Sequence, residues 1–119
     1  MGSRYSLREA MIIGTRCEGR PCDANEISRQ IGAGAVLAIS GGRQYVIKND
    51  ADEVVGLRLP IDGTRRVDIV LDWDDTYIVR RMRRVVAGKL IGTDFVEFDR
   101  HGVYCDEVAE VAYAASCWK

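Results

Sequence analysis

Apolar and polar residues alternate along the central part of the chain, from about Ala35 to Val86, with the period of two that is typical of half-buried strands. Short polar or glycine-rich pairs interrupt this alternation at Gly41-Gly42, Asp62-Gly63 and Asp74-Asp75, and each of them favours a tight turn. The pattern therefore predicts an antiparallel β-meander of four to five strands. The candidate segments for these strands are Ala35–Ser40, Arg43–Lys48, Val54–Ile61, Arg65–Trp73, the return segment after Asp75 and Lys89–Phe98.

The turn at Asp74-Asp75 sets the expected register of the longest hairpin. If these two residues form the whole turn, Leu71 faces Ile78 on one side of the sheet and Asp68 faces Arg81 on the other. One side is then mostly apolar and the other carries an opposite-charge pair, as a half-buried sheet requires. A longer loop would shift the register, and that alternative stays open.

Two segments carry helical signals instead. Asp23 followed by Glu26 is an N-capping pattern, Ile27 and Ile31 share one helical face, and Gly32 suits the end of the helix. Near the C-terminus, apolar residues recur at steps of three and four between Val103 and Trp118. The residues on that predicted face are Tyr104, Val108, Val111, Ala115 and Trp118.

Together these elements predict the α+β class. The expected architecture is an antiparallel β-meander with a short N-terminal helix and a longer C-terminal helix packed on one face. Residues 1–22 show weak signals and are expected to be a weakly structured N-terminal segment. Residues 23–119 are expected to form a single α+β domain.

The composition is that of an ordinary globular domain. The chain has 119 residues, of which 47% are hydrophobic and 29% charged, and its net charge is −1. A near-neutral chain lacks the global basic excess typical of nucleic-acid binders. No apolar run approaches the about 18 residues that a membrane span needs, and no signal peptide is evident. We expect a cytoplasmic protein with reduced thiols and no membrane partner.

Positive charge is nevertheless concentrated around one hairpin. In the expected register, Arg65 and Arg66 lie opposite Arg84 and Arg83. This cluster could contact phosphate oxygens, with Tyr77 or Tyr45 stacking on a base. Salt bridges to nearby carboxylates such as Asp68 are the alternative. The candidate anion-binding or nucleic-acid-binding residues are Arg65, Arg66, Arg81, Arg83, Arg84 and Tyr77.

Other candidate chemistry is weaker. Asp72, Asp74 and Asp75 could hold a divalent metal, but an aspartate-rich turn is explained equally well by bonds from side chain to backbone. Cys17 and Cys22 have a spacing that some zinc sites use, without the usual second pair. With His101 as the single histidine, no nucleophile–base arrangement stands out. We expect no catalytic residues, no metal and no cofactor.

Three strings resemble a known group of proteins. They are Asn25–Gly34, Leu71–Tyr77 and Gly102–Glu107, and together they resemble short proteins of unknown function encoded by actinobacterial phages and prophages. The resemblance runs from about Cys17 to the C-terminus. It implies an origin in a phage or mobile element, in the cytoplasm of a bacterial host, and it assigns no mechanism.

Three functions follow as hypotheses. The first is a small non-enzymatic accessory protein that binds a host or phage protein. The second is a nucleic-acid-binding module that uses the arginine-rich hairpin, and the third is a metal-dependent enzyme that uses Asp72, Asp74 and Asp75. Pairing of exposed edge strands would also allow a dimer.

Overall fold

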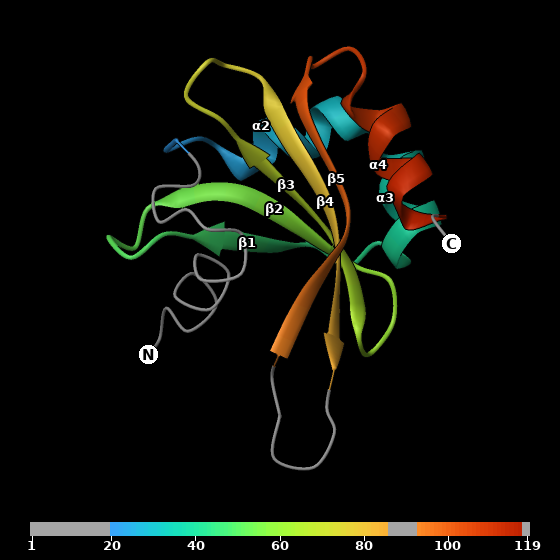
Figure 1. The fold of residues 1–119 in the computed structure, drawn as a ribbon. Coiled ribbons are helices and arrows are strands. Elements are labelled where there is room, and N and C mark those ends of the chain that lie inside the picture. Colours follow the sequence, from blue (N-terminus) through green and yellow to red (C-terminus); the bar gives the residue numbers. More distant parts are fainter. Residues whose placement is uncertain (1–19, 86–92, 118–119) are drawn as a thin grey trace.

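The computed structural model describes residues 20–85 and 93–117 and confirms the α+β class (Figure 1). Five antiparallel strands form one sheet in the order β1-β2-β3-β4-β5, so each strand pairs with its neighbour in sequence. This is the expected meander. Its strands are β1 (Tyr45–Lys48), β2 (Val54–Pro60), β3 (Arg65–Leu71), β4 (Tyr77–Val85) and β5 (Thr93–Val103).

Three helices lie on one side of this sheet in Figure 1: α2 (Ala24–Ile31), α3 (Ala33–Ser40) and α4 (Val108–Ser116). The capping signal at the start of α2 is confirmed, because the side chain of Asp23 accepts a hydrogen bond from the Asn25 backbone N–H at 2.9 Å. Ile27 and Ile31 are buried, and Gly32 ends the helix with a φ of 92°. Local sequence signals thus account fully for α2.

The predicted strand Ala35–Ser40 is wrong, because this segment is helix α3. Half of its residues are alanine or leucine, which favour helices, and they include only two β-branched side chains. Gly41 adopts the left-handed conformation, with a φ of 66°, and donates its backbone N–H to Leu37. The Gly41-Gly42 pair therefore terminates a helix and does not form a hairpin turn.

The register of the β3–β4 hairpin differs by one residue from the simplest expectation. Asp75 has a φ of 69°, and the Asp72 N–H bonds to the Thr76 carbonyl, so three residues form the loop. Such a loop consists of a tight turn followed by one residue in the left-handed conformation. This third loop residue shifts the pairing of β3 and β4 by one residue relative to a two-residue turn. Leu71 faces Tyr77 and Val70 faces Ile78. Ile78 consequently points to the opposite side of the sheet from the predicted one, although it is still buried.

The C-terminal helix is shorter than predicted. The chain stays in β5 as far as Val103, and α4 begins only at Val108, after a turn in which the Glu107 N–H bonds to the Tyr104 carbonyl. Tyr104 therefore lies outside the helix and is exposed, whereas Val108, Val111 and Ala115 are buried as expected. Strand β5 is described from Thr93 to Val103, and its predicted start at Lys89, like Trp118, lies outside the described residues.

The main core lies between the sheet and the three helices. Leu59, Val67, Ile69 and Val79 are fully buried there, and they meet side chains from all three helices. A separate small cluster consists of Ile47, Val55 and Val70. Val70 and Ile78 are next in sequence to Ile69 and Val79, whose side chains belong to the main core. Because successive side chains of a strand point to opposite sides of the sheet, Val70 and Ile78 point away from the helices. Both surfaces of the central strands are buried.

The prediction for residues 1–22 falls almost entirely outside the described part of the chain. Of that segment the structure describes only residues 20–22, where the Cys22 N–H bonds to the Val54 carbonyl. Residues 23–85 and 93–117 form one α+β unit around the main core. Within these ranges, no helix is long and apolar enough to cross a membrane.

Candidate functional site

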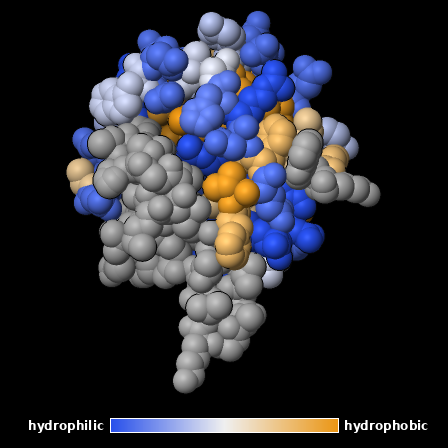
Figure 2. Space-filling model, in the orientation of Figure 1, coloured by the Kyte–Doolittle hydropathy of each residue, from blue (hydrophilic) through white to orange (hydrophobic). Residues whose placement is uncertain are grey.

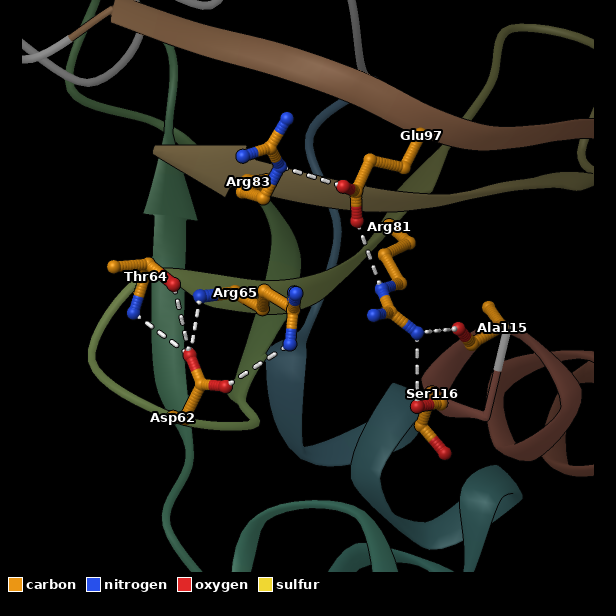
Figure 3. Close-up of polar contacts among 8 residues, drawn as sticks. All are labelled: Asp62, Thr64, Arg65, Arg81, Arg83, Glu97, Ala115 and Ser116. Atoms are coloured by element: carbon orange, nitrogen blue, oxygen red, sulfur yellow. Dashed lines mark hydrogen bonds and ion pairs between the residues drawn. The ribbon is translucent and has the colours of Figure 1, made fainter. Parts of the chain in front are cut away.

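Two of the candidate arginines, Arg81 and Arg83, are bound within the fold (Figure 3). Both donate to the carboxylate of Glu97, at 3.1 and 2.7 Å. Arg81 is buried and also donates to the carbonyls of Ala115 and Ser116 at the end of α4. A cation in this position stabilises the unpaired carbonyls of a helix C-terminus. The main role of Arg81 in the structure is to fix α4 on the sheet.

A β-bulge explains how one glutamate reaches both arginines. Arg81 faces Phe98 and Met82 faces Val96, so Glu97 has no partner on β4. An extra residue of this kind re-aims its side chain. Glu97 therefore lies against two side chains that are two residues apart on the same side of β4.

A second charged cluster is centred on the buried Asp68 of β3. Its carboxylate accepts from Arg58 at 3.0 Å and from Arg66 at 3.2 Å. The side chains of Asp68 and Arg66 are only 3% and 8% exposed. The expected pairing of Asp68 with Arg81 is wrong, because the register places Asp68 opposite Arg80, and Arg80 donates to Asp99.

The remaining candidates, Arg65, Arg66 and Arg84, line a pocket at one corner of the sheet, together with Arg58 and Lys48. We call it the arginine pocket. Its described lining also includes Tyr45, an exposed aromatic residue of β1. Sequence reasoning had named three of these five cations. It missed Lys48 and Arg58 because they lie on β1 and β2, away from the hairpin.

Carboxylates are part of the same pocket. Asp50, Asp52 and Asp62 contribute to its lining. Asp62 pairs with Arg65 at 3.6 Å and accepts the backbone N–H groups of Thr64 and Arg65, as Figure 3 shows. The hydrogen bond from the Thr64 N–H is the largest cause of the lowered pKa of Asp62. The pocket thus has more cationic side chains than carboxylates, and hydrogen bonds hold the carboxylate of Asp62 in place.

Tyr77 does not lie with the arginines. It is buried under α2, where its hydroxyl donates to the Gln30 side chain at 2.6 Å. Burial raises the pKa of Tyr77, and the nearby Cys22 and Glu26 raise it further. A buried, hydrogen-bonded phenol is part of the core and is not placed to stack on a base.

This placement predicts an alkaline loss of stability. Because the folded pKa lies above the unfolded value of about 10, the contribution of Tyr77 is complete below that pH and is lost as pH rises through the folded pKa. We expect Tyr77→Phe to cost about 1 kcal/mol at neutral pH and to flatten the decline at high pH. Urea unfolding of both proteins from pH 7 to 11 measures this, and parallel pH curves would argue against it.

The aspartates of the β3–β4 turn are explained by the hydrogen bonds and the ion pair that they make within the fold. Asp74 accepts hydrogen bonds from the Thr76 hydroxyl and N–H, and these bonds lower the pKa of Asp74. Asp72 accepts the Trp73 N–H, and Asp75 pairs with Arg20. Among the described residues, no group of histidine, cysteine, aspartate or glutamate side chains is arranged to hold a metal ion. The metal-dependent enzyme therefore gains no support from this turn.

The cysteine and histidine candidates lie apart from the arginine pocket. Cys17 is outside the described residues, and Cys22, Cys105 and Cys117 are free thiols. Burial raises the pKa of Cys22, which makes its thiolate less available. His101 is exposed and pairs with Asp99 at 3.1 Å, near the end of β5. No arrangement of nucleophile and base emerges from these described side chains.

Sequence reasoning also missed an exposed apolar surface on the helices. On α3, Ala33, Gly34, Leu37 and Ala38 are exposed, and on the adjacent α4 Tyr113 and Ala114 are exposed one turn after the charged Glu110, which is also exposed. We call the six uncharged residues the outer helical face. Leu37 is 65% exposed and Tyr113 is 49% exposed. The segment had been predicted as a strand, so its second apolar side was not recognised as a surface.

The exposed edge β5 differs from this surface. In Figure 2, apolar atoms near the centre of the view, where β5 crosses in Figure 1, lie beside hydrophilic ones. Phe95 of β5 is half exposed, but two bulges interrupt the strand, and β5 also carries the charged residues Glu97, Asp99 and Arg100. Bulges and charges of this kind protect a sheet edge from pairing with another chain.

Comparison of the chain with models of protein families, with curated proteins and with solved structures gave no significant match.

Proposed function

We propose that this protein acts by binding another protein, through the outer helical face. The observation that carries the proposal is the composition of α3. The helix contains no charged residue, yet only Val36, Ile39 and Ser40 are buried. Helices on the surface of soluble domains normally carry polar or charged residues on their outer side. Apolar residues on that side instead favour an interaction surface.

The two helices together widen this surface. Helix α3 contacts α4, and both helices lie on the same side of the molecule in Figure 1. The exposed alanine and glycine residues of α3 have small side chains or none, whereas Leu37 and Tyr113 are larger apolar groups. Small residues beside a few large apolar ones suit contact with the apolar side of a partner helix.

The resemblance to phage proteins is consistent with this role. A small accessory protein encoded by a mobile element would bind a host protein or another phage protein. The nucleic-acid hypothesis is weaker than the sequence indicated, because Arg81 and Arg83 both donate to Glu97 and Tyr77 is buried. We therefore do not include these three residues in a ligand-binding surface.

The test is the substitution Leu37→Lys. Because Leu37 is exposed near the end of a helix, we expect a stability change within about 0.5 kcal/mol. Quantitative affinity purification from cells that carry the gene should recover at least one protein with the wild-type chain and lose it with the variant. Trp73→Lys is the matched control, since it changes an equally exposed apolar residue in the β3–β4 turn.

Two results would contradict the proposal. One is recovery of the same proteins in the same amounts by Leu37→Lys and by the wild type. The other is loss of the partner with Trp73→Lys but not with Leu37→Lys. Sedimentation of the purified chain provides a separate check, because association that Leu37→Lys abolishes would identify the partner as a second copy of this protein.

A further inference from the structure

We propose that the arginine pocket, together with the outer edge of β1, binds an extended acidic segment of a partner protein. This site is distinct from the outer helical face, and it does not depend on what that face binds. The proposal starts from the charge of the pocket. Its described lining holds five cationic side chains and three carboxylates. The cations still exceed the carboxylates by one if Asp68, which binds Arg58 and Arg66, is included.

Part of this charge is held in exposed ion pairs. Lys48 pairs with Asp52 at 3.4 Å and Arg65 with Asp62 at 3.6 Å, and in each pair both side chains are more than a third exposed. Exposed pairs of this length contribute little to stability. An incoming carboxylate can therefore share or replace the partner of Lys48 or Arg65 at low cost, while the net positive charge attracts it.

The edge of the sheet provides the second part of the site. Strand β1 pairs with β2 on one side, and no other described strand pairs with it on the other side. Tyr45 and Val46 of β1 are each at least half exposed and also line the pocket. An extended peptide that adds to such an edge gains affinity from main-chain hydrogen bonds. Every second side chain of the peptide contacts the adjacent surface, and these contacts provide specificity.

The mixture of charges favours a peptide over a nucleic acid. A nucleic-acid strand presents one phosphate about every 3.4 Å along its length. Asp50, Asp52 and Asp62 would repel such a backbone where it crosses the pocket. A peptide can place separated carboxylates near the arginines and Lys48, and its N–H groups can donate to strand and aspartate acceptors. We therefore assign the pocket to an acidic peptide.

The experiment measures fluorescence anisotropy of labelled peptides with the full chain. The first probe is a decapeptide that alternates glutamate and valine, and its matched probes replace glutamate by lysine or methylate alternate backbone nitrogens. We expect the acidic peptide to bind, with affinity falling as salt rises. The lysine peptide should bind at least about tenfold more weakly. The methylated peptide should also bind more weakly because strand pairing needs its N–H groups.

Variants of the protein locate the site. We expect Arg84→Ser and Lys48→Ser each to weaken binding of the acidic peptide about three- to fivefold. Arg83→Ser is the matched control, because Arg83 lies on the same strand as Arg84 but contacts Glu97 outside the pocket, and it should change binding less than about twofold. Leu37→Lys should bind the peptide like the wild type, which separates this site from the outer helical face.

Several results would overturn the proposal. These are equal binding of the acidic and lysine peptides, no effect of Arg84→Ser and Lys48→Ser, or no binding of the acidic peptide at low salt. Tighter binding of a ten-nucleotide thymidine strand than of the acidic peptide would assign the pocket to nucleic acid instead. Equal binding of the methylated peptide would exclude addition to the β1 edge.

Discussion

Gly56→Ala is expected to destabilise the protein by about 3 kcal/mol or more. A Cβ atom at this position would lie 2.3 Å from the Ile69 carbonyl oxygen and 3.1 Å from the Val70 Cα. Both are backbone atoms of β3, and Gly56 faces Val70 in the centre of the sheet. The clash cannot be relieved by rotating a side chain, so β2 and β3 would have to separate.

Gly34→Ala is the matched control for this prediction. It adds the same methyl group, but a Cβ at Gly34 has no neighbour within 4 Å. Because alanine favours a helix over glycine, we expect Gly34→Ala to stabilise the protein by about 0.5 to 1 kcal/mol. Urea unfolding followed by circular dichroism measures both variants. Equal effects of the two changes, or a stable Gly56→Ala protein, would contradict the close approach of β2 and β3.

Asp68→Asn is expected to have the next largest effect, a loss of about 3 to 5 kcal/mol. Asparagine keeps the shape of the side chain but removes the negative charge that Arg58 and Arg66 share. The positive charges that remain in a largely buried position repel one another, and leaving them there costs far more than an exposed pair is worth.

The control for this change is Asp52→Asn. Asp52 is exposed and pairs only weakly with Lys48, and its φ of 65° is a conformation that asparagine tolerates well. We expect a change within about 0.5 kcal/mol. Thermal unfolding at low and moderate salt compares the two variants. A small loss for Asp68→Asn would mean that the Asp68 cluster is not needed to hold β2 and β3 together.

Elements with local signals were predictable from the sequence. The capping residue Asp23, the apolar pair Ile27 and Ile31 and the terminal Gly32 all lie within one short segment, so α2 was predicted correctly. The meander was also predictable, since each strand pairs with the next one along the chain. Helix α3 was not, because residues 35–39 are apolar at every position, so the period of two assigned from Ala35 does not hold there and periodicity cannot tell a helix from a strand.

The contacts that the candidate site residues make depend on local backbone conformations that cannot be predicted from the sequence pattern. The register of β3 and β4 depends on Asp75 adopting a left-handed conformation, and the position of Glu97 depends on a bulge in β5. Both features decide which carboxylate each arginine meets. The outer helical face was hidden for a different reason, since an apolar segment assigned to a strand was assumed to be buried in the sheet.

The most direct test of the central claim is photocrosslinking from the outer helical face. A benzophenone amino acid would replace Leu37 in one protein and Trp73, an equally exposed residue of the β3–β4 turn, in another, both produced in cells that carry the gene. We expect a covalent adduct with one defined protein from position 37 and none from position 73. Adducts of the same size and yield from both positions, or from position 73 alone, would contradict the central claim.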